Sequence, residues 1–171
     1  MIQIYCGDGK GKTSASVGAA VRAAGRNLKV LFVQFLKCED SGERKVLSLI
    51  DKIDLTPCPV ELQFTINMTD AQKAQASKIF REIFDHAVRT ALVAKYNVLI
   101  LDEVFSAMET RMLSENDVYS FLADAPASLE IILTGRNPAD KFIQLADYVS
   151  EIIKVKHPYD NGTRARIGIE F

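Results

Sequence analysis

The stretch "GDGKGKT" (residues 7–13) combines three glycines with Lys12 and Thr13 in a pattern typical of loops that bind phosphate. Glycine lets the backbone turn tightly and point its N–H groups at an anion. Lys12 is expected to reach the phosphates, and the Thr13 hydroxyl to bind Mg²⁺. The strict motif G-x-x-x-x-G-K-[ST] asks for Gly where this chain has Cys6, so the match is incomplete.

The surroundings of this loop strengthen the interpretation. It follows the apolar run 1–6 and opens an Ala-rich segment that ends at Gly25, which predicts a strand, a loop and a helix in that order. The positive N-terminal end of such a helix also attracts an anion. The candidate nucleotide-binding residues of the segment are Gly7, Asp8, Gly9, Lys10, Gly11, Lys12, Thr13 and Ser14.

A second motif, "NVLILDE" (97–103), places four apolar residues directly before Asp102 and Glu103. This pattern is typical of a buried strand whose terminal carboxylates bind Mg²⁺ beside a phosphate loop. We therefore predict a metal site made by Thr13, Asp102 and Glu103.

Polar residues also follow two other predicted strands, and ligands of parallel sheets bind at the carboxyl ends of the strands. Gln34 and Lys37 follow the apolar run that begins at 29, and Arg136 follows the run that begins at 129. We expect Gln34 and Lys37 to contact the nucleotide, and Arg136 to stabilise phosphate charge.

Ordinary structural roles remain open for several of these side chains. Asp102 could cap a turn, with Glu103 simply solvated. Arg136 could form a surface salt bridge. His157 follows the last predicted parallel strand and is as compatible with a structural role as with a functional one.

Strands alternate with helices along the chain, which predicts one three-layer α/β domain over residues 1–171. The expected fold is that of a RecA-like P-loop NTPase with a mainly parallel central sheet. A further strand is predicted at 60–65 and a short helix after Ser41. A long helix from about 70 to 95 is predicted to start with a capping box, Thr69 with Gln72. The pair Asn161-Gly162 predicts a C-terminal β-hairpin.

Composition excludes several classes of protein. With 21 basic and 22 acidic residues the net charge is −1, which disfavours nucleic acid as a partner. No apolar run approaches the roughly 20 residues of a membrane span, and no signal peptide is recognisable. The three cysteines show no CxxC spacing, which indicates reduced thiols and a cytoplasmic location.

Several segments together resemble the corrinoid adenosyltransferases of the CobA/BtuR/CobO type. The matching stretches run from residue 7 to 171, and they are "GDGKGKTSAS", "GAAVRAAG", "VLFVQFLK", "LILDE", "TGRNPAD", "LADYVSEI", "VKHPYDNG" and "ARIGIEF". Members of this family do not require Gly at the first loop position. The resemblance implies transfer of the 5′-deoxyadenosyl group of ATP to the Co(I) of a corrinoid, with release of triphosphate.

For the site, the resemblance implies that residues 7–13 hold the triphosphate together with Mg²⁺ or Mn²⁺, with Lys12, Glu103 and Arg136 as catalytic residues. Because Co(I) is itself the nucleophile, the protein has to position the reactants and stabilise the leaving group. The resemblance also implies a homodimer and a cobalt reductant such as a flavin or flavoprotein.

The chain departs from the family pattern at some positions. Cys38 replaces a common Gly, Ile66 stands where many members carry an aromatic residue, and the chain has no Trp. Phe64 and Met68 are candidate apolar contacts for the corrinoid, with core packing as the alternative role of Phe64. Since the chain starts at its first strand, it is expected to lack the N-terminal extension of longer members. Two alternatives stay open: a P-loop ATPase or kinase acting at the γ-phosphate, and a non-catalytic regulator that binds ATP or a corrinoid.

Overall fold

Strands and helices alternate along almost the whole chain in the computed structural model, which describes residues 1–36, 41–58 and 69–169. The strands are β1 (Ile2–Cys6), β2 (Val30–Gln34), β3 (Ile53–Leu55), β4 (Val98–Asp102), β5 (Glu130–Thr134) and β6 (Tyr148–Glu151). The helices are α1 (Lys12–Ala24), α2 (Gly42–Leu47), α3 (Asp70–Val93), α4 (Val104–Glu109), α5 (Glu115–Ala123) and α6 (Asp140–Leu145), followed by the 3₁₀ turn η1 (Pro158–Asn161).

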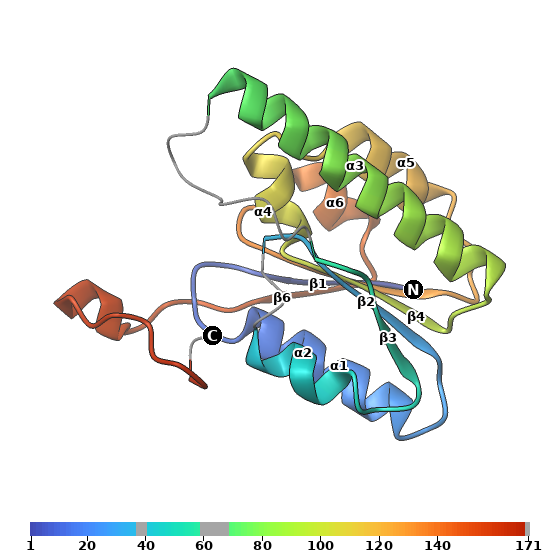
Figure 1. The fold of residues 1–171 in the computed structure, drawn as a ribbon, viewed down its shortest axis with the longest axis horizontal. Helices are drawn as coiled ribbons and strands as arrows, with labels where there is room; N and C mark the ends of the chain where they lie inside the picture. Colours follow the sequence, from blue (N-terminus) through green and yellow to red (C-terminus); the bar gives the residue numbers. More distant parts are fainter. Residues whose placement is uncertain (37–40, 59–68, 170–171) are drawn as a thin grey trace.

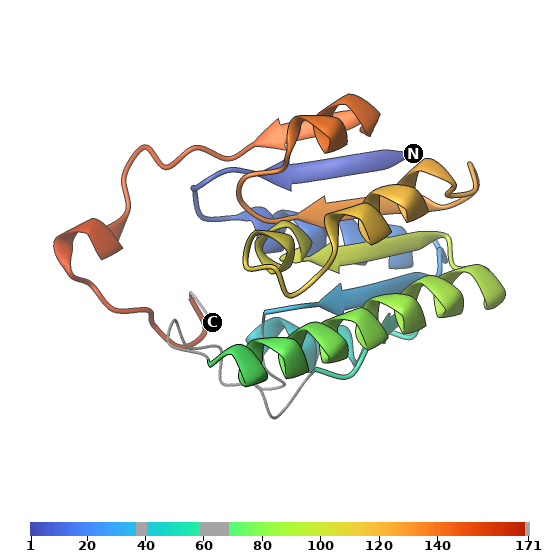
Figure 2. The ribbon, with the colours of Figure 1, turned by 90° about the horizontal axis from the view of Figure 1, so that it is seen from above.

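The described strands form one sheet in the order β3-β2-β4-β5-β1-β6, and every pair of neighbours is parallel. All strands therefore end at the same edge of the sheet, on the left in Figure 2. Strand β5 lies between β1 and β4. As a result, the loop after β1 and the acidic residues Asp102 and Glu103 at the end of β4 flank the end of β5, which is Thr134.

Helices cover both faces of the sheet, so the domain has three layers (Figure 1). Helices α1 and α2 lie on one face, and α3, α4, α5 and α6 lie on the other. All five residues of β2 and all five of β4 are buried, as expected for strands covered on both sides. Successive residues of these strands alternate between two hydrophobic cores.

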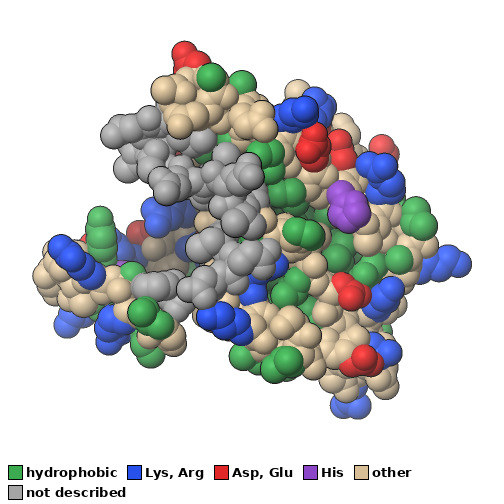
Figure 3. Space-filling model, viewed as in Figure 1, with side chains coloured by type: hydrophobic (Ala, Val, Ile, Leu, Met, Phe, Trp, Pro, Cys, Tyr) green, Lys and Arg blue, Asp and Glu red, His purple; other side chains and the backbone are tan. Residues whose placement is uncertain are grey.

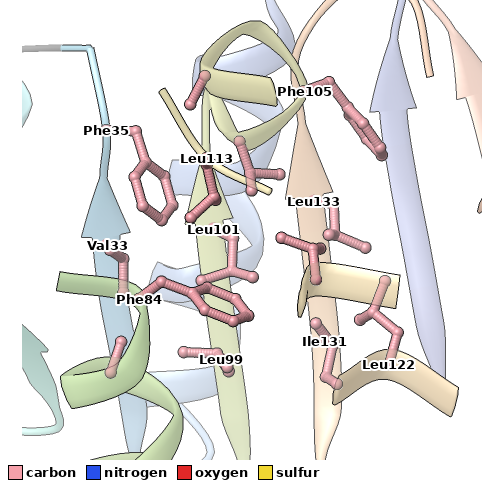
Figure 4. Close-up of a cluster of buried hydrophobic side chains, with 14 of the residues drawn as sticks. Val33, Phe35, Phe84, Leu99, Leu101, Phe105, Leu113, Leu122, Ile131 and Leu133 are labelled. Carbon is pink, nitrogen blue, oxygen red and sulfur yellow. The ribbon is translucent and has the colours of Figure 1, made fainter. Parts of the chain in front are cut away.

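The larger core fills the space between the sheet and α3 to α6. Figure 4 shows Val33, Leu101 and Leu133 from neighbouring strands in one layer of this core. Phe80 and Phe84 of α3 are buried against it, and the Phe80 ring stacks on that of Phe35 with centroids 5.7 Å apart. The face of α3 that carries these side chains is thus a core-packing surface.

The predicted capping box of α3 is confirmed, and α5 begins with a similar side-chain cap. The Thr69 hydroxyl accepts a hydrogen bond from the Gln72 backbone N–H, and the Gln72 side chain accepts one from the Thr69 backbone N–H, which completes the capping box of α3. The Ser114 hydroxyl likewise accepts from the Asp117 backbone N–H at the start of α5. These caps satisfy donors that a helix leaves without intrahelical partners.

The predicted C-terminal β-hairpin is wrong for the part of the chain that the structure describes. Strand β6 pairs in parallel with β1, and no second strand follows it up to residue 169. Pro158 has a fixed φ and lacks an N–H, and the His157 side chain accepts from Tyr159, so a 3₁₀ turn starts here instead. Gly162 ends this turn at φ 77°, so the Asn-Gly pair closes η1 and not a hairpin.

Other predictions of secondary structure had mixed outcomes. The short helix after Ser41 is present as α2, whereas β3 and α4 were not predicted. The predicted strand at 60–65 lies outside the described residues. Among the described helices, none is both long enough and apolar enough to span a membrane.

The segment that leaves β6 packs directly on the phosphate-loop region. The Ile152 backbone N–H donates to the Cys6 carbonyl at 2.8 Å, and the Ile152 carbonyl accepts from the Gly9 N–H at 2.7 Å. A Cβ atom on Gly7 would lie 2.5 Å from the Ile152 carbonyl oxygen, and one on Gly9 would lie 2.7 Å from it. Close approach of the chain after β6 therefore requires glycine at both positions.

This contact predicts that Gly9→Ala destabilises the protein by about 1–3 kcal/mol, because the added methyl group meets backbone atoms that cannot move independently. Thermal unfolding measures the loss, and hydrogen exchange should show faster exchange for the amides after β6. Gly18→Ala is the matched control, since a Cβ there meets nothing within 4 Å. In the interior of α1 that change should stabilise by about 0.5–1 kcal/mol. Equal stability of the two variants would contradict the prediction.

Candidate functional site: a phosphate-loop cleft

Residues 7–11 connect β1 to α1, so the predicted order of strand, loop and helix is confirmed. Gly11 occupies the cap position of α1 at φ 127°, a conformation that favours glycine, and Lys12 is the first helical residue. Cys6 is the last residue of β1 and its side chain is buried in the larger core, where burial raises the pKa of its thiol. The first position of the motif therefore belongs to the strand, which explains why Cys is accommodated there.

The loop forms one wall of a cleft with a volume of about 640 Å³. Three other parts of the chain complete the cleft: the start of α2, the ends of β4 and β5, and the C-terminal segment. Its lining residues are Asp8, Gly9, Lys10, Gly11, Lys12, Thr13, Ser14, Val17, Gly42, Glu43, Glu103, Arg136, His157, Ala165, Gly168 and Ile169.

Most of the predicted site residues meet in this cleft, but three do not line it. Gly7 lies against Ile152, and Gln34 and Asp102 are buried beneath the cleft. Lys37 lies outside the described residues, as do Cys38, Phe64, Ile66 and Met68.

Asp102 is a buried carboxylate at the end of β4 that joins three elements. Its Oδ2 accepts hydrogen bonds from the Thr13 hydroxyl and from the Gln34 amide, both at 3.2 Å, and its Oδ1 accepts from the Thr134 hydroxyl at 2.7 Å. A fully buried carboxylate needs such donors, because burial without them is costly. Asp102 therefore fixes the start of α1 relative to the ends of β2 and β5.

Glu103 is placed by an unusual backbone conformation. Its φ of 61° is rare for a residue other than glycine, and it stands at the cap position of α4. The Glu103 N–H donates to the Thr134 hydroxyl at 2.9 Å, and the Ser106 hydroxyl donates to the Glu103 carboxylate. These contacts hold the backbone in this turn, and the side chain lines the cleft. Non-glycine residues in such conformations are often found at functional sites.

Lys12 is largely buried in the wall of the cleft, at 8% exposure. Its Nζ donates to the Gly9 carbonyl across the loop at 2.9 Å. Burial lowers the pKa of Lys12, an effect that the nearby Glu103 carboxylate opposes. An anion in the loop would add an opposite charge beside the ammonium group and favour its charged form.

Arg136 and His157 face the cleft from two further segments. Arg136 is exposed and follows Gly135, where a Cβ atom would lie 2.6 Å from that of Phe105. The Nδ1 atom of His157 accepts from the Tyr159 N–H at 3.1 Å. His157 thus has the structural role that its sequence left open, while its ring also contributes to the wall of the cleft. Figure 3 shows Lys and Arg side chains along the C-terminal segment, where Lys154, Lys156, Arg164 and Arg166 are exposed.

The oxygen donors near the loop fit a small hard cation. The Thr13 hydroxyl and the Asp102 carboxylate are in contact, and the Glu103 side chain lies in the same cleft. Among the described residues, no three His, Cys, Asp or Glu side chains form a group that could hold a metal ion by themselves. In proteins Mg²⁺ usually takes one or two carboxylates and completes its shell with phosphates and water.

Part of the site was not recognised from the sequence. Gly42 and Glu43 of α2 line the cleft without belonging to any recognised motif, whereas Ala165, Gly168 and Ile169 belong to the stretch "ARIGIEF", to which the sequence assigned no role in the site. These residues are far from the loop in the sequence, and the tertiary fold brings them next to it. The only sequence signal available for Glu43 was its place in the first turn of a predicted helix that follows β2.

The fold resembles that of a known ATPase. A solved structure titled "EssC (ATPases 2 and 3)" from Geobacillus thermodenitrificans superposes with a TM-score of 0.52 at 12% identity, and covers 98% of this chain and 34% of that one. With the parallel three-layer sheet, this likeness confirms the predicted P-loop NTPase fold.

Comparisons of sequence identify the family. The family model described as "ATP:corrinoid adenosyltransferase BtuR/CobO/CobP" matches residues 1–171. The "Corrinoid adenosyltransferase" of Escherichia coli K12 is 34% identical over the whole of this chain and 85% of its own length. "Corrinoid adenosyltransferase CobA" of Salmonella typhimurium is 32% identical, also over the whole chain and 85% of its own length. The chain belongs to the ATP:corrinoid adenosyltransferase family.

Proposed function

We propose that this protein transfers the 5′-deoxyadenosyl group of ATP to the Co(I) centre of a corrinoid and releases triphosphate. The observation that carries the proposal is the convergence of Lys12, Thr13 and Asp102 at one phosphate loop, in a chain whose family model matches it from end to end. The relatives named corrinoid adenosyltransferase support the choice of substrates.

The reaction is a displacement at carbon. The electron pair of Co(I) forms a bond to C5′ of ATP, the bond from C5′ to the triphosphate oxygen breaks, and its electron pair leaves with triphosphate. Cobalt is formally oxidised from Co(I) to Co(III) by this transfer. The protein has to align the two substrates and stabilise the charge that develops on the leaving oxygen.

The residues of the cleft fit the second task. Lys12 supplies a positive charge inside the loop, and Arg136 brings a guanidinium group from the end of β5. We assign Thr13 and Asp102 as the residues that hold Mg²⁺ or Mn²⁺, with Glu103 beside them. When bound, such a cation neutralises part of the triphosphate charge.

Further features of the proposal rest on the family. The corrinoid is expected beyond the ribose end of ATP, with Phe64 and Met68 as candidate contacts. We infer a homodimer, a cytoplasmic location, and a flavin or flavoprotein that reduces cobalt. One structural observation supports a second copy: β6 is an edge strand whose four residues are all exposed, and two of them are Tyr148 and Val149.

A second candidate function is hydrolysis or transfer of the γ-phosphate. The observation that favours it is Glu103, whose side chain lines the cleft where it could orient an attacking water or hydroxyl. In that case the bond that breaks would lie between phosphorus and oxygen, and ADP would be a product.

Product analysis separates these candidates. The protein is incubated with Mg-ATP and a chemically reduced corrinoid, and the products are identified by ³¹P NMR and by the absorbance of the corrinoid. We expect triphosphate and a light-sensitive Co–C bond in equal amounts. ADP and phosphate without alkylated corrinoid would support the second candidate. Binding of ATP without turnover would support a regulator and contradict the proposal.

Lys12→Ala should abolish turnover and weaken ATP binding, because the loop loses the charge that faces the triphosphate. The expected loss of turnover is at least about 10²-fold, the effect of removing one stabilising donor. Turnover and calorimetric binding of ATP measure it, and circular dichroism should show an unchanged fold. Lys78→Ala, an exposed lysine on α3, is the control and should behave as wild type. Normal turnover of Lys12→Ala would overturn the assignment of the loop.

A further inference from the structure

Gln34 is the last residue of β2 and is almost completely buried, at 1% exposure. It does not belong to the residues that line the cleft. A buried primary amide needs hydrogen-bond partners for its two N–H donors and its carbonyl acceptor. The partners of these groups show what Gln34 does.

Both donors of the amide go to carboxylates. The Gln34 Nε2 atom lies 2.9 Å from Oε1 of Glu43 and 3.2 Å from Oδ2 of Asp102. Since Nε2 carries two hydrogens, each carboxylate can receive one of them. Hydrogen bonds to charged groups are the stronger kind, and a buried one is costly to lose.

The acceptor side of the amide faces Arg44. A guanidinium nitrogen of Arg44 donates to Gln34 Oε1 at 3.4 Å, and another donates to the Thr56 carbonyl at 2.8 Å. Arg44 is itself buried, and a guanidinium can only donate. Its position therefore fixes the orientation of the amide, with the carbonyl toward Arg44 and the NH₂ group toward the two carboxylates.

The two carboxylates belong to different elements, β4 and α2. Asp102 lies under Thr13 at the start of α1, whereas Glu43 comes from the first turn of α2 and lines the cleft. Two nearby negative charges repel each other, and a neutral donor shared between them offsets this repulsion. Gln34 thereby links α2 to the phosphate loop through hydrogen bonds.

We propose that Gln34 is a positioning residue for the cation and triphosphate: it holds Asp102 and Glu43 in place, and Glu43 is a further residue of the site. The inference rests on the proposed function only in taking residues 7–13 as the triphosphate site. Gln34 contacts no reactant, and it acts on the affinity for the cation–triphosphate complex through the two carboxylates.

The test uses Gln34→Met, which keeps the length of the side chain and removes its hydrogen bonds. Calorimetry measures binding of tripolyphosphate with Mn²⁺ and, separately, with EDTA and no divalent cation. We expect binding with Mn²⁺ to weaken by about 10–100-fold, as for other residues that orient metal ligands. Binding without the cation should change less than threefold, because the carboxylates do not attract a bare anion. An equal loss in both conditions would indicate general damage and overturn the proposal.

Glu43→Gln is a second test. Glu43 is only partly buried, so this change should affect the stability of the fold less than Gln34→Met does. It should also weaken binding with Mn²⁺. In the double variant the loss should be smaller than the product of the two single effects, because Gln34→Met removes the same contact that Glu43→Gln weakens. Independent effects, or binding by Glu43→Gln equal to wild type, would contradict the role of Glu43.

Gln3→Met is the matched control. The Gln3 amide donates to the Glu130 carboxylate at 2.7 Å, so the change removes the same kind of hydrogen bond away from the cleft. It should leave binding of Mn²⁺–tripolyphosphate unchanged, and a loss equal to that of Gln34→Met would overturn the proposal. These readouts need no corrinoid. Failure of adenosyl transfer with the binding results intact would therefore contradict the proposed function and not this inference.

Discussion

The buried carboxylate of Asp102 is the constraint on which the rest of the site depends. A charge with no exposure to water is tolerated only when donors surround it, and these donors come from Thr13, Gln34 and Thr134. Each donor sits where a strand ends or where α1 begins. Because a buried charge without partners is costly, Asp102 fixes the start of α1 and the ends of β2 and β5 relative to one another. The cleft forms above this arrangement.

The parallel sheet makes such convergence possible, and this is why much of the fold was predictable. Continuous apolar runs before Gln34 and before Asp102 indicated strands buried on both faces, and such strands occur in parallel sheets. Once all strands are parallel, the polar residues that follow them must share one edge. The loop, the acidic pair and Arg136 could be assigned to one site on this argument alone, without any knowledge of side-chain contacts.

Contacts between distant segments could not be predicted in the same way. The glycines at 7 and 9 suggested an anion cradle, yet both are also required by Ile152, more than 140 residues away. The Asn161-Gly162 pair suits a hairpin locally, but the turn that begins at Pro158 uses it as a helix end. Glu43 carries no motif, and in the folded chain Gln34 joins it to Asp102 through hydrogen bonds. In each case a tertiary contact decides the role of a residue whose sequence neighbourhood allows several.

The central claim is that these strand ends build a cradle for a cation and the triphosphate leaving group. A crystal structure with ATP and Mn²⁺, with anomalous scattering recorded to locate manganese, tests it most directly. We expect one manganese peak next to the Thr13 hydroxyl, on the side of Asp102, with the phosphates of ATP inside residues 7–13. Manganese bound elsewhere, or phosphates outside the loop, would contradict the account.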